Sequence, residues 1–96
     1  MPRGILYRIR SAVHDAAYDA TVHAVEQVAE DNLDIIDVET AILNGGLIKQ
    51  EKDDLRGTRY TIHGVAADGN TAVAVVGRFS DVGRFLIISV YKIGDR

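Results

Sequence analysis

Apolar side chains recur at three- and four-residue steps through the first part of the chain, and charged side chains lie between them. The apolar positions of this pattern are Ile5, Ile9, Val13, Ala16 and Ala20. This spacing places them along one side of an α-helix, which completes a turn about every 3.6 residues. We therefore expect an amphipathic helix over residues 4 to 18.

A second apolar stripe follows over residues 21 to 31. Its members are Val22, Val25, Val28 and Ala29. Glu26 and Glu30 face water in this helix, and the Thr21 hydroxyl is placed to accept a hydrogen bond as an N-cap. No proline or glycine separates the two stripes. The pattern therefore leaves open whether they form one long helix or two helices.

A third helix is expected over residues 35 to 44. Asp34 can cap it, and Asp37 occupies the matching position of a capping box three residues later. Its apolar positions are Ile35, Val38, Ala41, Ile42 and Leu43. The segment ends at Asn44-Gly45-Gly46, and glycine just past a helix commonly terminates it.

The rest of the chain is rich in β-forming and turn residues, which predicts four strands. We place them at residues 47 to 51, 59 to 66, 71 to 79 and 84 to 93. Asp68-Gly69 supplies a hairpin turn, and the nearly continuous apolar run of the third strand is typical of a central strand covered on both faces. Helices followed by an antiparallel sheet of about four strands indicate an α+β fold with helices on one sheet face. The other face is then solvated, paired with a partner or used for binding.

Composition bounds the class of protein. The chain has 96 residues, of which 47% are hydrophobic and 26% charged, and it contains no cysteine. We expect one domain over residues 1 to 96, because a chain of this size supports a single core. The absence of cysteine excludes a disulfide framework, a thiolate nucleophile and a cysteine-type zinc site, and it favours a cytoplasmic protein. No apolar run approaches the roughly 18 residues that span a membrane, so no membrane association is expected.

The charge is distributed unevenly although the net charge is only −3. Residues 1 to 55 carry five basic and eleven acidic side chains, a balance of −6, whereas residues 56 to 96 carry six basic and three acidic ones, a balance of +3. One interpretation is an anion-binding sheet backed by an acidic helical layer. Compositional accident explains the same numbers equally well, and both interpretations stay open.

Four segments, taken in order, carry a family resemblance. Thr21-Val22-His23-Ala24 has a hydroxyl residue, any residue and then His-Ala, and the helix of residues 34 to 45 follows it. Residues 57 to 64 form an Arg/Tyr strand ending in glycine, and Ile87-Ile88-Ser89-Val90-Tyr91 is close to Ile-Ile-Thr-Val-Tyr. Together they resemble the small bacterial family of domain of unknown function 4258 over about residues 18 to 93.

Two features depart from the pattern of that family. Its members commonly carry arginines in the helix after His-Ala, where this chain has Gln27 and Glu30-Asp31. Two positive charges are therefore absent from a helix that would handle phosphate. Residues 4 to 17 also extend beyond the family-like core, as a helical element that would cap the domain or support a homodimer.

The resembled family is itself similar to ribonuclease toxins of the RelE, BrnT and MqsR type, in which helices pack on one face of an antiparallel sheet. The resemblance implies a metal-independent RNA endonuclease that needs no cofactor, with RNA as substrate and an antitoxin protein as partner; it implies no DNA target. Fold-level analogy does not establish chemistry. A non-catalytic interaction module, using the open sheet face for a partner or for its own copy, is the alternative.

Cleavage of RNA by its own 2′-hydroxyl needs a base, cations for the phosphorane and an acid for the leaving oxygen. The candidate catalytic residues are His23, Arg59 and His63; the candidate RNA contacts are Arg56, Arg78, Arg84 and Lys92; Tyr60 and Tyr91 are supporting residues. Arg59 and His63 share a strand face because side chains alternate along a strand. For each candidate a structural role, such as a packed histidine or a solvated strand face, is the alternative.

The same alternation applies to the last strand. It places Phe85, Ile87, Ser89 and Tyr91 on one face and Leu86, Ile88, Val90 and Lys92 on the other. Tyr91 and Lys92 then cannot share an open surface unless the strand ends or bulges. We expect no metal site, because His14, His23 and His63 lack the spacing that brings ligands together. The glycines show no phosphate-loop spacing, so no nucleotide cofactor is expected.

Overall fold

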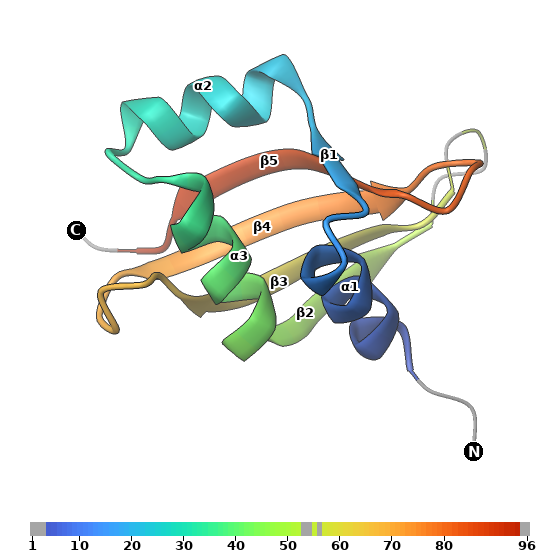
Figure 1. The fold of residues 1–96 in the computed structure, drawn as a ribbon, viewed down its shortest axis with the longest axis horizontal. Helices are drawn as coiled ribbons and strands as arrows, with labels where there is room; N and C mark the ends of the chain where they lie inside the picture. The colour runs from blue at the N-terminus through green and yellow to red at the C-terminus, as the bar shows by residue number, and fades with distance from the viewer. Residues whose placement is uncertain (1–3, 53–54, 56, 95–96) are drawn as a thin grey trace.

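Three helices and a five-stranded sheet form the described part of the chain in the computed structural model, which covers residues 4–52, 55 and 57–94 (Figure 1). The helices are α1 (Ile5–His14), α2 (Val22–Glu30) and α3 (Ile35–Asn44). The strands are β1 (Tyr18–Ala20), β2 (Gly46–Glu51), β3 (Arg59–Val65), β4 (Ala72–Phe79) and β5 (Phe85–Lys92). None of these helices has the length and apolar character that crossing a bilayer requires.

The sheet is open and mixed, with the strand order β1-β5-β4-β3-β2. β1 runs parallel to β5, and the other neighbours are antiparallel. The α+β class and the four strands expected after residue 46 are confirmed, and α3 occupies the expected residues 35 to 44. The sheet is not purely antiparallel, because β1 adds a fifth strand at its edge.

The predicted helix over residues 4 to 18 is wrong at its end, because α1 stops at His14. Ala16 takes a left-handed conformation with φ 58°, which breaks the helical path. Tyr18–Ala20 then pairs with Phe85–Ile87 of β5. The question of one helix or two is settled, since a strand separates α1 from α2. Pairing with a distant strand decides the conformation here, and helical spacing alone does not.

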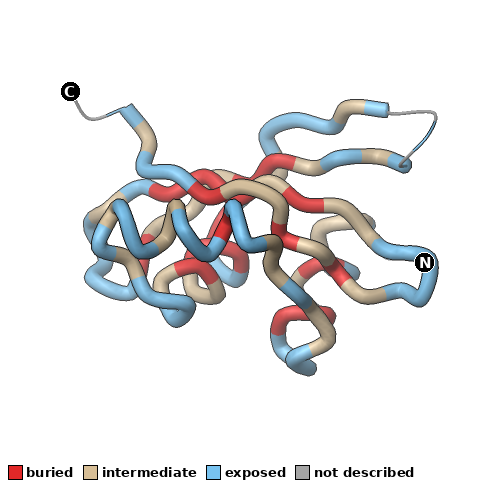
Figure 2. Tube along the Cα trace, turned by 90° about the horizontal axis from the view of Figure 1, so that it is seen from above, coloured by how far each residue is buried: buried red, intermediate tan, exposed pale blue. Residues whose placement is uncertain are grey.

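The core lies between the helices and one face of the sheet. Figure 2 shows the buried positions concentrated in the middle of the structure, with the loops at its ends exposed. The largest fully buried side chains are Phe85, Ile9, Ile42, Ile62, Ile87, Val38, Val73, Val75 and Val90. Gly64 lets α3 approach β3 closely, because a Cβ there would lie 1.9 Å from the Ala41 carbonyl oxygen. The expectation that the third predicted strand, β4, is central is confirmed.

α2 covers the edge of β5 beyond the short β1 (Figure 1). The Thr21 amide donates to the Ile87 carbonyl oxygen at 2.9 Å, and the Thr21 hydroxyl donates to that of Ile88 at 3.1 Å. The Gln27 Oε1 accepts from the Val90 amide at 2.8 Å. These contacts satisfy backbone groups that an edge strand would otherwise leave unpaired.

A β-bulge at Ile88 changes which side chains β5 presents to each face. Gly77 pairs with Ile87 and Val76 pairs with Ser89, so Ile88 is the extra residue. Ile87 and Val90 are both buried in the core, although strict alternation places them on opposite faces. The predicted alternation along the last strand is therefore wrong after Ile87, and Tyr91 lies on the face away from the helices.

Candidate functional site

A hollow of about 480 Å³ lies on the face of the sheet opposite the helices. Its lining residues come from β2, β3, β4 and β5, and we call this site the open-face groove. They are Ile48, Lys49, Glu51, Arg59, Thr61, His63, Val76, Ile88, Ser89 and Tyr91. Charged, hydroxyl and imidazole groups therefore share one surface with a few aliphatic side chains.

Two rows of paired residues cross the groove. In one, His63 on β3 pairs with Ala74 on β4, and Ala74 pairs with Tyr91 on β5. His63 and Tyr91 are two strand spacings apart, roughly 10 Å between their backbones. Ala74 itself is fully buried and does not line the groove. His63 and Tyr91 therefore line the groove from two strands that β4 separates.

The second row lies next to the first and carries hydroxyl groups. Lys49, Thr61, Val76 and Ser89 pair in succession across four strands. The Ser89 hydroxyl donates to the Gln27 Oε1 at 3.0 Å, which ties the groove to α2. This row therefore has two hydroxyl groups next to the His63–Tyr91 row, and Gln27 holds that of Ser89 in place.

Three charged side chains lie together at the end of the groove. The Glu51 Oε2 lies 3.4 Å from the Lys49 Nζ, and the Glu51 Oε1 lies 3.4 Å from an Arg59 guanidinium nitrogen. The side chains of Lys49, Glu51 and Arg59 are 61%, 43% and 50% exposed, so these ion pairs are weak. Glu51 therefore holds both cations only weakly, and all three charged groups remain partly open to solvent.

The structure brings three predicted residues together in this groove, namely Arg59, His63 and Tyr91. Tyr60 alternates with them and packs against the core from the helix side. Arg56 lies outside the described residues. The shared face of Arg59 and His63 is the part of the site that alternation predicted.

His23 does not line the groove but lies at its flank. It is exposed in the first turn of α2 and precedes Gln27 by one helical turn. Residues four apart share a face of a helix, so His23 lies on the same side of α2 as the contact between Gln27 and Ser89. Its catalytic role stays a prediction.

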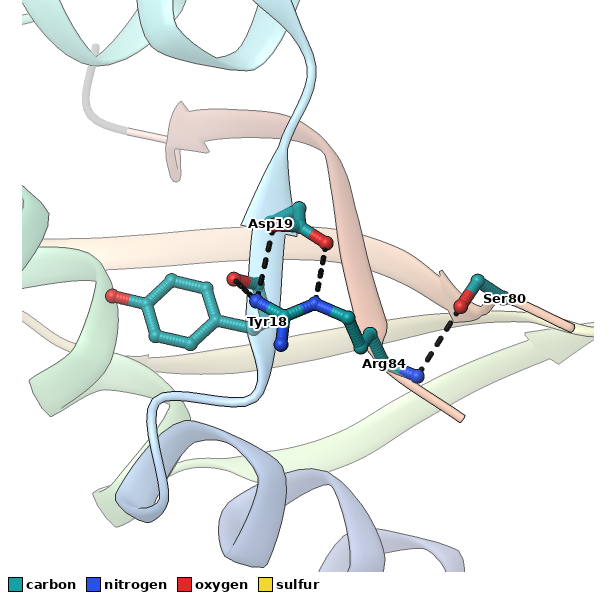
Figure 3. Close-up of polar contacts among 4 residues, drawn as sticks. All are labelled: Tyr18, Asp19, Ser80 and Arg84. Atoms are coloured by element: carbon teal, nitrogen blue, oxygen red, sulfur yellow. Dashed lines mark hydrogen bonds and ion pairs between the residues drawn. The ribbon is translucent and has the colours of Figure 1, made fainter. Parts of the chain in front are cut away.

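Arg84 has a structural partner. Its Nε donates to the Asp19 Oδ2 at 2.8 Å, and its Nη2 donates to the Asp19 Oδ1 at 3.1 Å and to the Tyr18 carbonyl oxygen at 3.0 Å (Figure 3). The hydrogen bonding between the Arg84 and Asp19 side chains lowers the pKa of Asp19 and raises that of Arg84. The guanidinium thereby links β1 to the start of β5, and an RNA contact by Arg84 stays a prediction.

The remaining two predicted RNA contacts lie apart from the groove. Arg78 lines a separate hollow of about 440 Å³ with Ser80 and Leu86. Lys92 lies at the end of β5, where its amide donates to the Asp31 carboxylate at 3.4 Å. Neither lines the open-face groove, and their binding of RNA stays a prediction.

Sequence reasoning did not nominate Lys49, Thr61, Ser89 or Glu51, which also line the groove. Thr61 was accessible from alternation, because it lies between Arg59 and His63 on their strand face. Lys49 and Glu51 were not, because a bulge between Leu47 and Lys49 turns them away from the core that Leu47 contacts. Residues 4–52, 55 and 57–94 hold no group of three ligands suited to a metal ion.

The fold and this site define a class: an α+β domain with helices on one face of a mixed five-stranded sheet and a polar groove on the other. A family model described as "Domain of unknown function (DUF4258)" matches residues 20–92. The chain belongs to that family, and α1 lies outside the matched residues. No curated protein and no solved structure matches the chain.

Proposed function

We propose that the chain is a RelE-like toxin domain, a metal-independent endoribonuclease that binds RNA in the open-face groove. The observation that carries this proposal is the meeting of Arg59, His63 and Tyr91 in one hollow. Lys49 adds a second cation beside Arg59. Proton-transfer groups and cations are the two requirements of RNA cleavage without a metal.

In the proposed reaction the ribose 2′-oxygen attacks the adjacent phosphorus, and the bond from phosphorus to the 5′-oxygen breaks. The products are a 2′,3′-cyclic phosphate and a 5′-hydroxyl. His63 takes the proton of the 2′-hydroxyl, and Arg59 and Lys49 stabilise the charge that develops on the phosphoryl oxygens. Tyr91 donates the proton that the 5′-oxygen needs, and the protonated His63 returns a proton to Tyr91 through solvent.

The same proposal includes an antitoxin protein as the natural inhibitor and the cytoplasm as the compartment, where RNA is available. Arg78, in the next hollow, extends the positive charge for a neighbouring phosphate, and His23 approaches from the flank. The negative balance of the helical half of the chain favours the sheet as the RNA-binding surface.

The test is incubation of the purified protein with end-labelled RNA in excess EDTA. We expect fragments that carry 2′,3′-cyclic phosphate ends, and a loss of at least about 100-fold in rate for His63→Ala and for Arg59→Ala. His14→Ala is the matched control, because His14 is exposed on α1 and does not line the groove. In a bacterial host, induction should arrest growth and fragment RNA. Unchanged cleavage by folded His63→Ala would remove His63 from the mechanism.

A non-catalytic interaction module is the second candidate. It is favoured by Ile48, which is 58% exposed at the groove, and by the Glu51 carboxylate, which offsets part of the positive charge there. Such a surface suits a protein partner or a second copy of this chain. Normal growth with intact RNA, in cells that contain soluble folded protein, would favour this candidate over the ribonuclease.

A further inference from the structure

A second, apolar groove of about 270 Å³ lies between α2 and α3, on the helix side of the molecule. The helices line it with Ala24, Val25, Val28, Ala29, Ile35 and Val38. Every lining side chain is aliphatic, so none offers a hydrogen bond to a sugar, nucleotide or polar metabolite. The groove is therefore suited to bind aliphatic side chains.

The rim of this apolar groove is unusually exposed. Val25 is 57% and Ile35 45% exposed, and the neighbouring Val22 and Ile36 are 74% and 55% exposed. Branched aliphatic side chains gathered at this exposure, rather than scattered singly, mark an interaction surface. Two helices that leave a groove between them can receive the apolar side of a third helix.

Charge indicates the chemistry of the occupant. Between Arg10 and Lys49 the chain has no lysine or arginine and eight acidic residues, which include all the acids of α2 and α3. Several of these acids have defined roles, but Glu26 and Glu30 on α2 have no cationic partner within ion-pair distance among the described residues. Both carboxylates lie on the water-facing side of α2, away from the residues that line the groove, so they act through the negative potential around it, which favours a basic occupant. A second copy related by a two-fold axis would instead bring like charges together.

We propose that this groove docks a basic amphipathic helix of another protein, with aliphatic side chains at positions i, i+3, i+4 and i+7. The lining includes Ile87 and Val90 of β5, whereas Ser89 and Tyr91 of the same strand line the open-face groove. The two sites thus lie on opposite faces of one strand. The docking site does not depend on the ribonuclease proposal.

The experiment uses the full chain and a fluorescein-labelled 14-residue peptide of leucine and lysine, with leucine at the helical positions. We expect micromolar binding by fluorescence anisotropy. Two peptides control for pattern and charge: one has the same composition with leucine at alternate positions, and the other has glutamate in place of lysine. Both should bind at least about 10-fold more weakly.

Variants of the protein localise the peptide. Val25→Ser and Ile35→Ser should each weaken binding about 5- to 10-fold, and Glu26→Gln with Glu30→Gln should reduce its salt dependence. Val82→Ser is the matched control, because Val82 is 81% exposed in the turn before β5. These lining residues are exposed, so the variants should keep the circular dichroism spectrum of the parent chain.

Three outcomes would overturn the proposal. They are no binding of the helical peptide up to about 1 mM, equal binding of all three peptides, and equal weakening by Val82→Ser and Val25→Ser. Sedimentation that shows a dimer converted to monomer by Val25→Ser would assign the groove to a second copy of the chain instead.

Discussion

The two faces of the sheet differ in what they bury and in what they present. The helix-facing side chains of the central strands, such as Ile62 and Val75, are fully buried. On the opposite face the same two strands place His63 and Val76 in the open-face groove. A single strand therefore supplies side chains to both the core and the candidate site. The register of the strand decides which side chains face the helices and which face the groove.

The strongest way to break this arrangement is to separate the helices from the sheet. Gly64→Ala would place a Cβ 1.9 Å from the Ala41 carbonyl oxygen, and backbone cannot yield as a flexible side chain can. We expect a loss of about 3 kcal/mol in the free energy of unfolding, at the upper end of ordinary overpacking. Urea denaturation followed by circular dichroism measures it.

Gly46→Ala is the control for that change. Gly46 also lies in a strand, but a Cβ there meets nothing within 4 Å. Its unfolding free energy should stay within about 0.5 kcal/mol of that of the parent chain. Similar losses for the two variants would mean that the close approach of α3 to β3 does not control stability.

Two neighbouring isoleucines sharpen the comparison between the faces. Ile87 is 1% exposed in the core, whereas Ile88 is the bulged residue and lines the open-face groove. Ile87→Ala should cost about 3 kcal/mol of unfolding free energy because it leaves a cavity, and Ile88→Ala should cost less than about 1 kcal/mol. Thermal or urea unfolding of the pair checks this difference. Equal costs would show that the bulge does not separate the two side chains in this way.

Much of the fold was accessible from the sequence because its signals are local. The α3 helix is defined by Asp34 and Asp37, whose capping box is present, and by the glycines that follow Asn44. The four later strands follow from β-forming runs between turn residues. β1 was not accessible, because its conformation depends on pairing with β5, whose sequence lies more than 60 residues away.

The candidate site was accessible only in part, for the same physical reason. Arg59 and His63 lie on one regular strand, so simple alternation places them together. Tyr91 and Lys49 follow bulges, and each bulge reverses the alternation for every residue beyond it. The bulged residues themselves, Ile48 and Ile88, are ordinary β-formers, and Gly77, the glycine at the second register shift, lies on the partner strand β4. The positions of these two side chains therefore depend on tertiary pairing.

The smallest expected effect is on the melting temperature, from the loss of Arg84. This arginine belongs to the basic half of the chain, but its hydrogen bonds support the fold. Arg84→Ala should lower the melting temperature at neutral pH, because it removes the hydrogen bonds to Asp19 and to the Tyr18 carbonyl oxygen (Figure 3). The pKa of Asp19 is lowered in the folded chain by the hydrogen bond from Arg84. The stabilisation is therefore fully present above the ordinary aspartate pKa of about 4 and is lost as the pH falls through the lowered value.

The difference in melting temperature between the parent chain and Arg84→Ala should thus be largest near neutral pH and should shrink below about pH 4. Asp19→Asn should reproduce most of this profile, and the double variant should lose little more than either single one, because both changes remove the same interaction. Additive losses would mean that Arg84 and Asp19 act independently. The link from β1 to β5 would then depend on backbone pairing alone, and Arg84 would again be available as a cation for the open sheet face.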